Sequence, residues 1–175
     1  MNQIPTTEKQ HHKNLIEFFH RLGEPRYPQL QFVKHTANEA LGGGGTKVQI
    51  RTDAGAVAYV PASVLEGYAM GVRPGVWDFE YLGPNLGPIP APEFSALPPI
   101  HPAGSFRGCA VELKVGKNTL SPDQERWQRQ YQANGWYTAV FYHWCEAATF
   151  FVRWVGGDPA QFEGLLLGAR KAGAR

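Results

Sequence analysis

The chain has 175 residues, 43% of them apolar and 13% aromatic, which is enough for one hydrophobic core and too few for two well-packed ones. The formal net charge of +2 excludes a protein that binds polyanions through overall charge alone. No apolar run is long enough to cross a membrane, and the N-terminus lacks a signal-peptide segment. We therefore expect a single domain over 1–175, located in the cytoplasm, with Cys109 and Cys145 as buried, reduced thiols.

The chain is predicted to begin with a helix. Residues Thr7 to Gln10 match a capping box, and apolar residues follow at helical spacing, so a helix is expected over about 8–22, ending at Gly23. His11 and His12 lie on this helix without partners at metal-ligand spacing. Exposed side chains are the expected state of both histidines.

Short strands are predicted after this helix. The sequence LQFVKH (30–35) is typical of a strand, and LGGGGTKVQI (41–50) is typical of a flexible loop that leads into another. The sequence GAVAYV (55–60) is the expected hairpin partner, followed by a short helix over 61–70. The four glycines lack the Gly-Lys-Ser/Thr ending of a phosphate-binding loop, so a flexible loop is the preferred interpretation.

The middle of the chain contains two alternating strands separated by prolines. In GVWDFEYL (75–82), we expect one face to carry Trp77, Phe79 and Tyr81 and the other to carry Val76, Asp78 and Glu80. Seven prolines between positions 84 and 102 disfavour helix and sheet, so an insertion at about 84–107 is predicted to be an extended loop or protrusion. The sequence CAVELKV (109–115) again alternates.

The last third is predicted to alternate helix and strand. Ser121 to Gln124 supply an N-cap, a proline in the first helical position and a capping-box glutamine, so a helix should run to Asn134-Gly135. The apolar segment 136–142 is typical of a central strand covered on both faces. Residues 145–155 favour a helix, with a strand as the alternative, before a short helix and a basic tail. This order predicts an α/β fold with a mixed sheet.

The residues with the clearest chemical potential lie on the two middle strands. Glu112 and Lys114 should project from one face, while Leu113 packs in the core. If the strands pair, Asp78 converges with them. Two close carboxylates repel, and Mg²⁺ or Mn²⁺ is the usual remedy, with the Leu113 carbonyl as a further ligand. Such an ion activates water for phosphodiester hydrolysis, which Lys114 could assist.

The alternative is that this triplet is an ordinary polar face. Any amphipathic strand can place an acid and a base toward solvent, and a short Glu-x-Lys match alone is more often a solvated pair. The upstream Asp78 and the helix start at Ser121 to Gln124 add context in a compatible order. Gln124 itself is explained equally well by helix capping and by a role in the site.

Three segments together resemble a known family. GVRPGVWDFEY, CAVELKVGKNTLSPDQERWQRQYQANGW and TAVFY are similar to the VRR-NUC branch of the PD-(D/E)XK nuclease superfamily, over about residues 71–142. The resemblance implies a restriction-endonuclease-like fold. It implies that Asp78, Glu112 and the Leu113 carbonyl hold metal, that Lys114 is the catalytic lysine, and that Gln124 belongs to the active site.

The match is looser elsewhere. Glu8 corresponds to an acidic residue on the first helix of the family that approaches the metal, and Asn38 to a frequent asparagine. The chain departs from the family at Trp77, where a proline is usual, and in the longer gap between Asp78 and Glu112.

The resemblance also implies a function. It indicates a Mg²⁺- or Mn²⁺-dependent endonuclease of the stand-alone phage or bacterial type, acting on branched, junction or flap DNA as a homodimer in the bacterial or phage-infected cell. Lys13, Lys117, Arg126 and Arg129 are ordinary solvent charges, but some of them would flank the proposed site and contact phosphates. The glycine loop, with Lys47 and Arg51 nearby, could border DNA. Two alternatives remain open at this point: a catalytically weak DNA-binding or assembly module of the same fold, and an RNA-cleaving nuclease.

Overall fold

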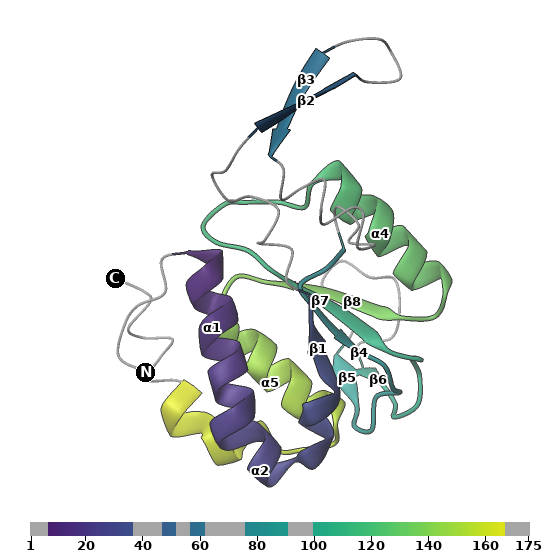
Figure 1. The fold of residues 1–175 in the computed structure, drawn as a ribbon. Coiled ribbons are helices and arrows are strands. Elements are labelled where there is room, and N and C mark those ends of the chain that lie inside the picture. Colours follow the sequence, from purple (N-terminus) through teal and green to yellow (C-terminus); the bar gives the residue numbers. More distant parts are fainter. Residues whose placement is uncertain (1–6, 37–46, 52–56, 62–75, 91–99, 167–175) are drawn as a thin grey trace.

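The computed structural model describes residues 7–36, 47–51, 57–61, 76–90 and 100–166. A four-stranded sheet with the order β1-β4-β7-β8 lies between helices (Figure 1). The predicted α/β class with a mixed sheet is confirmed, because β1, β4 and β7 pair antiparallel and β8 pairs parallel to β7. The strands are β1 (Val33–His35), β4 (Phe79–Tyr81), β7 (Cys109–Leu113) and β8 (Tyr137–Phe141).

The first helix begins where the sequence predicts. Its α-helical part is α1 (Glu8–Phe18), and a π-helical turn, η1 (Phe19–Gly23), continues it to the expected glycine. Thr7 accepts the Gln10 N–H at 3.2 Å, but the Gln10 side chain donates to Asn14 at 3.0 Å. Only half of the predicted capping box is therefore formed. The chain continues through α2 (Glu24–Arg26) and the 3₁₀ helix η2 (Pro28–Phe32), so the predicted strand at 30–35 is shortened to β1.

The remaining helices also follow the sequence patterns. Helix α4 (Pro122–Ala133) has the complete capping box of Ser121 and Gln124. Helix α5 (Trp144–Trp154) settles the alternative at 145–155 in favour of a helix. The 3₁₀ helix η4 (Pro159–Phe162) follows it.

Strand β8 differs from the prediction in its position. It is one of the two edge strands of the four-stranded sheet as described, whereas its apolar sequence predicted a central strand. The burial that explains this sequence is nevertheless present, since Phe141 packs on the larger core cluster and Val140 on the smaller one. Coverage of both faces, rather than a second strand neighbour, accounts for the apolar run.

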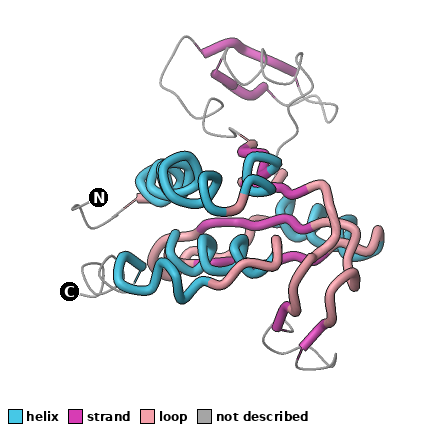
Figure 2. The backbone as a smooth tube through the Cα atoms, turned by 90° about the horizontal axis from the view of Figure 1, so that it is seen from below, coloured by secondary structure: helices cyan, strands magenta, loops and turns pink. Residues whose placement is uncertain are grey.

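Two apolar clusters cover the two faces of the sheet. The larger one joins β4, β7 and β8 to α1 and α5, which pack on each other (Figures 1 and 2). The smaller one lies under α4 and contains Trp77, Ala110 and Tyr131. Trp77 therefore does not share a face with Phe79, as the alternation predicted. The strand begins only at Phe79, after a bend at Asp78, so the period of two does not extend back to Trp77.

The proline-rich segment is more ordered at its two ends than predicted. Strand β5 (Ile89–Pro90) pairs with β6 (Ile100–His101), and Ile89 is fully buried. Two short strands suit prolines, because Pro90 has no N–H but keeps a carbonyl, which accepts from Tyr137 Oη at 2.9 Å. The expected protrusion is therefore wrong for these ends.

A second antiparallel ribbon confirms the predicted hairpin. Strands β2 (Lys47–Arg51) and β3 (Val57–Pro61) pair along their length and lie apart from the main sheet in both views (Figures 1 and 2). Cys109 and Cys145 are buried and form no disulfide within the described residues, as predicted. No helix within the described ranges is long and apolar enough to span a membrane. The predicted helix at 61–70, Asn38 and the basic tail lie outside the described residues.

Candidate functional site

The candidate site lies where β4 begins and β7 ends. Phe79 pairs with Val111, and extending this register by one step places Asp78 opposite Glu112. The Asp78 carboxylate accepts the backbone N–H of Leu113 at 2.8 Å between Oδ2 and N. The predicted pairing of these two strands is confirmed, and it brings Asp78 to the end of β7.

Glu112 and Lys114 form a buried ion pair on the α4 side of the sheet. Lys114 Nζ lies 2.8 Å from Glu112 Oε1, and both side chains are buried, with Glu112 only 2% exposed. The interpretation of this triplet as a solvated polar face is therefore wrong. Burying two charges together is costly unless they are paired and hydrogen-bonded, and this pair is held at the end of a central strand.

Gln124 fulfils both roles that the sequence left open. Its Oε1 accepts the Ser121 N–H at 2.9 Å and completes the capping box of α4. Its Nε2 donates a hydrogen bond to Glu112 Oε1. Because the cap fixes one end of the amide, the other end is directed at the carboxylate, so the start of α4 positions Glu112.

Trp77 adds a second link between α4 and the site. Its indole Nε1–H donates to the Gln124 carbonyl at 3.1 Å, and the ring is fully buried. The residue that departs from the family's proline therefore ties the approach to Asp78 to the first turn of α4. Sequence patterns did not predict this contact, because it joins residues 47 positions apart.

Glu112 has an unusual electrostatic environment. The pKa of Glu112 is raised from 4.5 to about 7, because burial and, to a smaller extent, the nearby charge of Asp78 raise it by more than the Lys114 ammonium lowers it. Its Oε1 has two donors, whereas its Oε2 is buried with no hydrogen-bond partner among the described residues. An oxygen in this state costs free energy unless another group binds it.

His12 is the residue of the site that sequence analysis missed. Its Nε2 lies 3.1 Å from Asp78 Oδ2, and its Nδ1 lies 3.2 Å from Nε2 of His35 on β1. His11 and His12 are 3% and 5% exposed, so the prediction that they are exposed is wrong. The signal was present in the helical period, since His12 precedes Leu15 and Phe19 by three and seven positions on the buried face.

Asp78, Glu112 and the Leu113 carbonyl supply some of the oxygen ligands that a hard divalent cation requires. The orphaned Glu112 oxygen and the repulsion between two carboxylates favour such an ion. The N–H of Leu113 faces Asp78, and the carbonyl of a strand residue points to the same side of the strand as its N–H, so the Leu113 carbonyl is on the Asp78 side of β7. Asp78 Oδ2 is already engaged by His12 and Leu113, which leaves its other oxygen as the donor.

The predicted fourth ligand is not brought into this group. Glu8 is half-buried in the first turn of α1, one turn before His12. Within the described residues there is no group of three or more His, Cys, Asp or Glu side chains arranged to hold a metal ion. Glu8 therefore does not form one with Asp78 and Glu112.

Glu80 is held away from the candidate site. Tyr131 of α4 donates a hydrogen bond to Glu80 Oε1, and burial together with this carboxylate raises the pKa of Tyr131. Asp78 instead contacts α1 through His12. Asp78 lies in the bend before β4 and Glu80 within β4, so the two acids face different helices and the predicted shared face is wrong. Glu80 acts as a structural partner of Tyr131.

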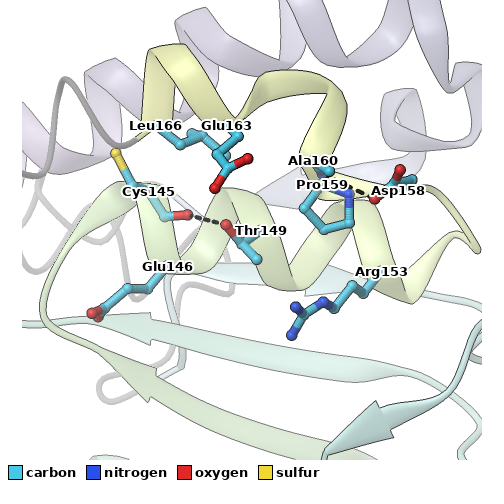
Figure 3. A pocket seen from close by; sticks show the side chains of 9 residues that line it. All are labelled: Cys145, Glu146, Thr149, Arg153, Asp158, Pro159, Ala160, Glu163 and Leu166. Carbon is cyan, nitrogen blue, oxygen red and sulfur yellow. Dashed lines mark hydrogen bonds between the residues drawn. The ribbon is translucent and has the colours of Figure 1, made fainter.

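A separate cavity of about 430 Å³ lies between α5 and the segment that follows it (Figure 3). Thr149 is in its wall and donates to the Cys145 carbonyl at 2.8 Å. Arg153, Asp158 and Glu163 surround it (Figure 3). None of the predicted site residues lines this cavity, so it is distinct from the group at the end of β7.

Comparison of the chain with models of protein families, with curated proteins and with solved structures gave no match.

Proposed function

We propose that this protein is a metal-dependent DNA endonuclease with a restriction-endonuclease-like core. The observation that carries the proposal is the meeting of two acids and a lysine at the ends of adjacent strands, where one buried oxygen of Glu112 has no donor in the part of the chain that the structure describes. A mixed sheet with helices on both faces is compatible with that core.

The proposed roles follow from the contacts. Asp78, Glu112 and the Leu113 carbonyl would hold Mg²⁺ or Mn²⁺, which when bound supplies charge neutralisation and a water of lowered pKa. Lys114, directed at Glu112, would place its ammonium beside the scissile phosphate and stabilise the charge that develops there. Gln124 and His12 would orient the two carboxylates.

The substrate and assembly are proposed from the family resemblance alone. Branched DNA, such as a junction or flap, is the first substrate to test, and a homodimer is the expected assembly. The expected setting is the cytoplasm of a bacterial or phage-infected cell.

The test is cleavage of labelled junction, flap and linear DNA with Mg²⁺, with Mn²⁺ and with EDTA. Cleavage should require the metal and should be lost in Asp78→Ala and Lys114→Ala. Matched controls are Asp123→Ala on α4 and Lys34→Ala, an exposed lysine on β1, which remove the same charges without touching Glu112 or Asp78. A matched RNA set would detect an RNA-cleaving enzyme.

One observation favours the rival, a DNA-binding module of the same fold: Asp78 Oδ2 is already engaged by His12 and Leu113. Metal-independent binding by the intact chain, with no cleavage of any substrate, would establish that rival and overturn the nuclease proposal.

A further inference from the structure

The β2–β3 ribbon has one face whose composition the nuclease site does not explain. Its register pairs Lys47 with Pro61, Gln49 with Tyr59, and Arg51 with Val57. Paired residues in an antiparallel ladder share a face, and the period of two places alternate positions together. One face therefore has basic positions at both ends of β2, with Gln49 and Tyr59 opposite each other between them. We call it the Tyr59 face.

The described side chains of the Tyr59 face are open to solvent. Tyr59 is 65% exposed, Val57 is 51% exposed, and Gln49 is exposed as well. A tyrosine at the centre of a strand normally packs against cross-strand neighbours or a core. Here its ring is available to a partner.

The charge of the ribbon selects the kind of partner. Strands β2 and β3 contain Lys47 and Arg51 and no acidic residue. Asp53 is the single acid in the sequence from 46 to 61. The two basic positions are four residues apart, or about 13 Å along a strand, with the aromatic position between them. Cations that flank an exposed ring are the combination that binds phosphates and stacks on a base.

The ribbon belongs to a segment of the chain whose two described flanks, Thr36 and Val76, lie next to Asp78. The segment that contains the ribbon leaves the sheet after Thr36 and returns at Val76. Thr36 N–H donates to the Asp78 carbonyl at 2.7 Å, so the chain leaves beside the candidate site, and Val76 stands two residues before Asp78. Both ends of the excursion thus adjoin the candidate metal ligand.

We propose that the Tyr59 face binds the DNA strand that enters the candidate site. Lys47 and Arg51 contact two phosphates, and Tyr59 stacks on a base or sugar between them. The identity of the polymer rests on the proposed function, whereas the binding itself is independent of cleavage. The contact is independent of sequence, because phosphates and base faces are common to all DNA.

The experiment measures binding of fluorescently labelled junction and linear DNA to the full chain in EDTA, by anisotropy, over a series of KCl concentrations. Lys47→Ala/Arg51→Ala should lower the slope of log K against log salt by about two, since each phosphate contact contributes about 0.9. Tyr59→Ala should weaken binding by about 5- to 100-fold with an unchanged slope. Tyr59→Phe should bind like the wild type.

The controls match the charge and the ring. Arg21→Ala/Arg26→Ala removes two exposed cations that lie beyond the C-terminal end of α1, and Tyr142→Ala removes an exposed tyrosine outside the ribbon. Equal slopes for the two double variants, together with equal affinities for Tyr59→Ala and Tyr142→Ala, overturn the inference. An equal loss of binding to a labelled poly-glutamate probe would assign a general acidic partner and also overturn it. Unchanged melting temperatures exclude unfolding as the cause.

Failure of this inference differs from failure of the nuclease proposal. A chain that cleaves no DNA, but whose ribbon variants lose DNA binding, keeps the Tyr59 face and loses the nuclease. A chain that cleaves DNA, with ribbon variants that bind and cleave as the wild type does, keeps the nuclease and loses the Tyr59 face.

Discussion

Asn85 and Glu112 are two of the most deeply buried polar residues of the described chain, but they differ in how completely their side chains are hydrogen-bonded. Asn85 is 1% exposed, and every polar atom of its side chain has a partner. Its Nδ2 donates to the carbonyls of Gly87 at 2.9 Å and Pro102 at 2.8 Å, and its Oδ1 accepts from Phe106 N–H at 3.1 Å. It joins the two ends of the proline-rich segment.

Glu112 is buried to the same degree but is only half satisfied. One of its oxygens has two donors, and the other has none among the described residues. The first residue lowers the free energy of the fold, whereas the second raises it at neutral pH. A buried polar group that is kept in an unfavourable state is a candidate for function, and a fully satisfied one is a structural link.

The sharpest test of this contrast is Glu112→Gln. Cleavage should fall by about 100-fold or more, the usual loss when a charge-stabilising group is removed from a site.

A pKa raised from 4.5 to about 7 means that the stability contributed by the protonated form of Glu112 is complete below pH 4.5 and is lost as pH rises through 7. Glutamine does not titrate, so the free energy of unfolding of Glu112→Gln should not show this decrease, which is on the order of 3 kcal/mol in the wild type. Urea unfolding in EDTA across this pH range measures it.

Parallel pH profiles of stability for wild type and Glu112→Gln would contradict the raised pKa. If the residue also binds metal, Mg²⁺ at pH 7.5 should raise the melting temperature of the wild type and leave that of the variant unchanged.

Asn85→Ala should show the opposite behaviour. Removing its amide leaves the Gly87 carbonyl and the Phe106 N–H without this partner, whereas the Pro102 carbonyl keeps the Ser105 hydroxyl at 2.7 Å. The expected cost is about 2 to 3 kcal/mol in the free energy of unfolding. Cleavage per folded molecule should stay at the wild-type value, because Asn85 touches none of the site residues. Denaturant titration with a single-turnover cleavage assay checks both. A specific loss of cleavage in the folded variant would break the contrast.

His11 provides a test on the structural side. Burial, together with the neighbouring His143 and His12, lowers the pKa of His11 from 6.5 to about 4, and its Nδ1 accepts the Trp144 N–H at 3.1 Å. Stability from the neutral ring is complete above pH 6.5 and is lost as pH falls toward 4. The loss is about 2 to 3 kcal/mol. Thermal unfolding against pH should show this slope in the wild type, and His11→Gln should flatten it.

Substitution of His12 should have the smallest effect on cleavage, because this residue is intermediate between the site residues, such as Glu112, and the structural residues, such as Asn85. Because it contacts Asp78 and not the substrate, His12→Leu should raise the Mg²⁺ concentration for half-maximal cleavage by about 10-fold. The melting temperature should change little, since leucine suits the buried helix face. His35→Leu, one contact further away, is the graded control. An unchanged metal requirement in His12→Leu would make this histidine purely structural.

Most elements that depend on neighbouring residues were predicted from the sequence. The Ser121 capping box starts α4 at Pro122, and the alternation of CAVELKV gives β7 with Glu112 and Leu113 on opposite faces. The hairpin at β2 and β3 was also found from pattern and turn residues. These features arise from local hydrogen bonds and side-chain periodicity, which depend only on residues that are close together in the sequence.

The predictions that were wrong or incomplete concern contacts between segments that are far apart in the sequence. The position of Trp77 depends on where the bend at Asp78 ends the strand period, and the ordering of the proline-rich ends depends on Asn85. The buried state of His12 was visible in the helical period, but its contact with Asp78 was not, because the two residues are 66 positions apart.

The sequence by itself determined the α/β order of elements, the strand that carries Glu112 and Lys114, and the cap that directs Gln124. Only the tertiary structure decided that this pair is buried, that one carboxylate oxygen has no donor within the described ranges, and that His12 contacts Asp78. The reason is physical: periodicity fixes the face on which a side chain lies, whereas its solvation and partners depend on which helix covers that face.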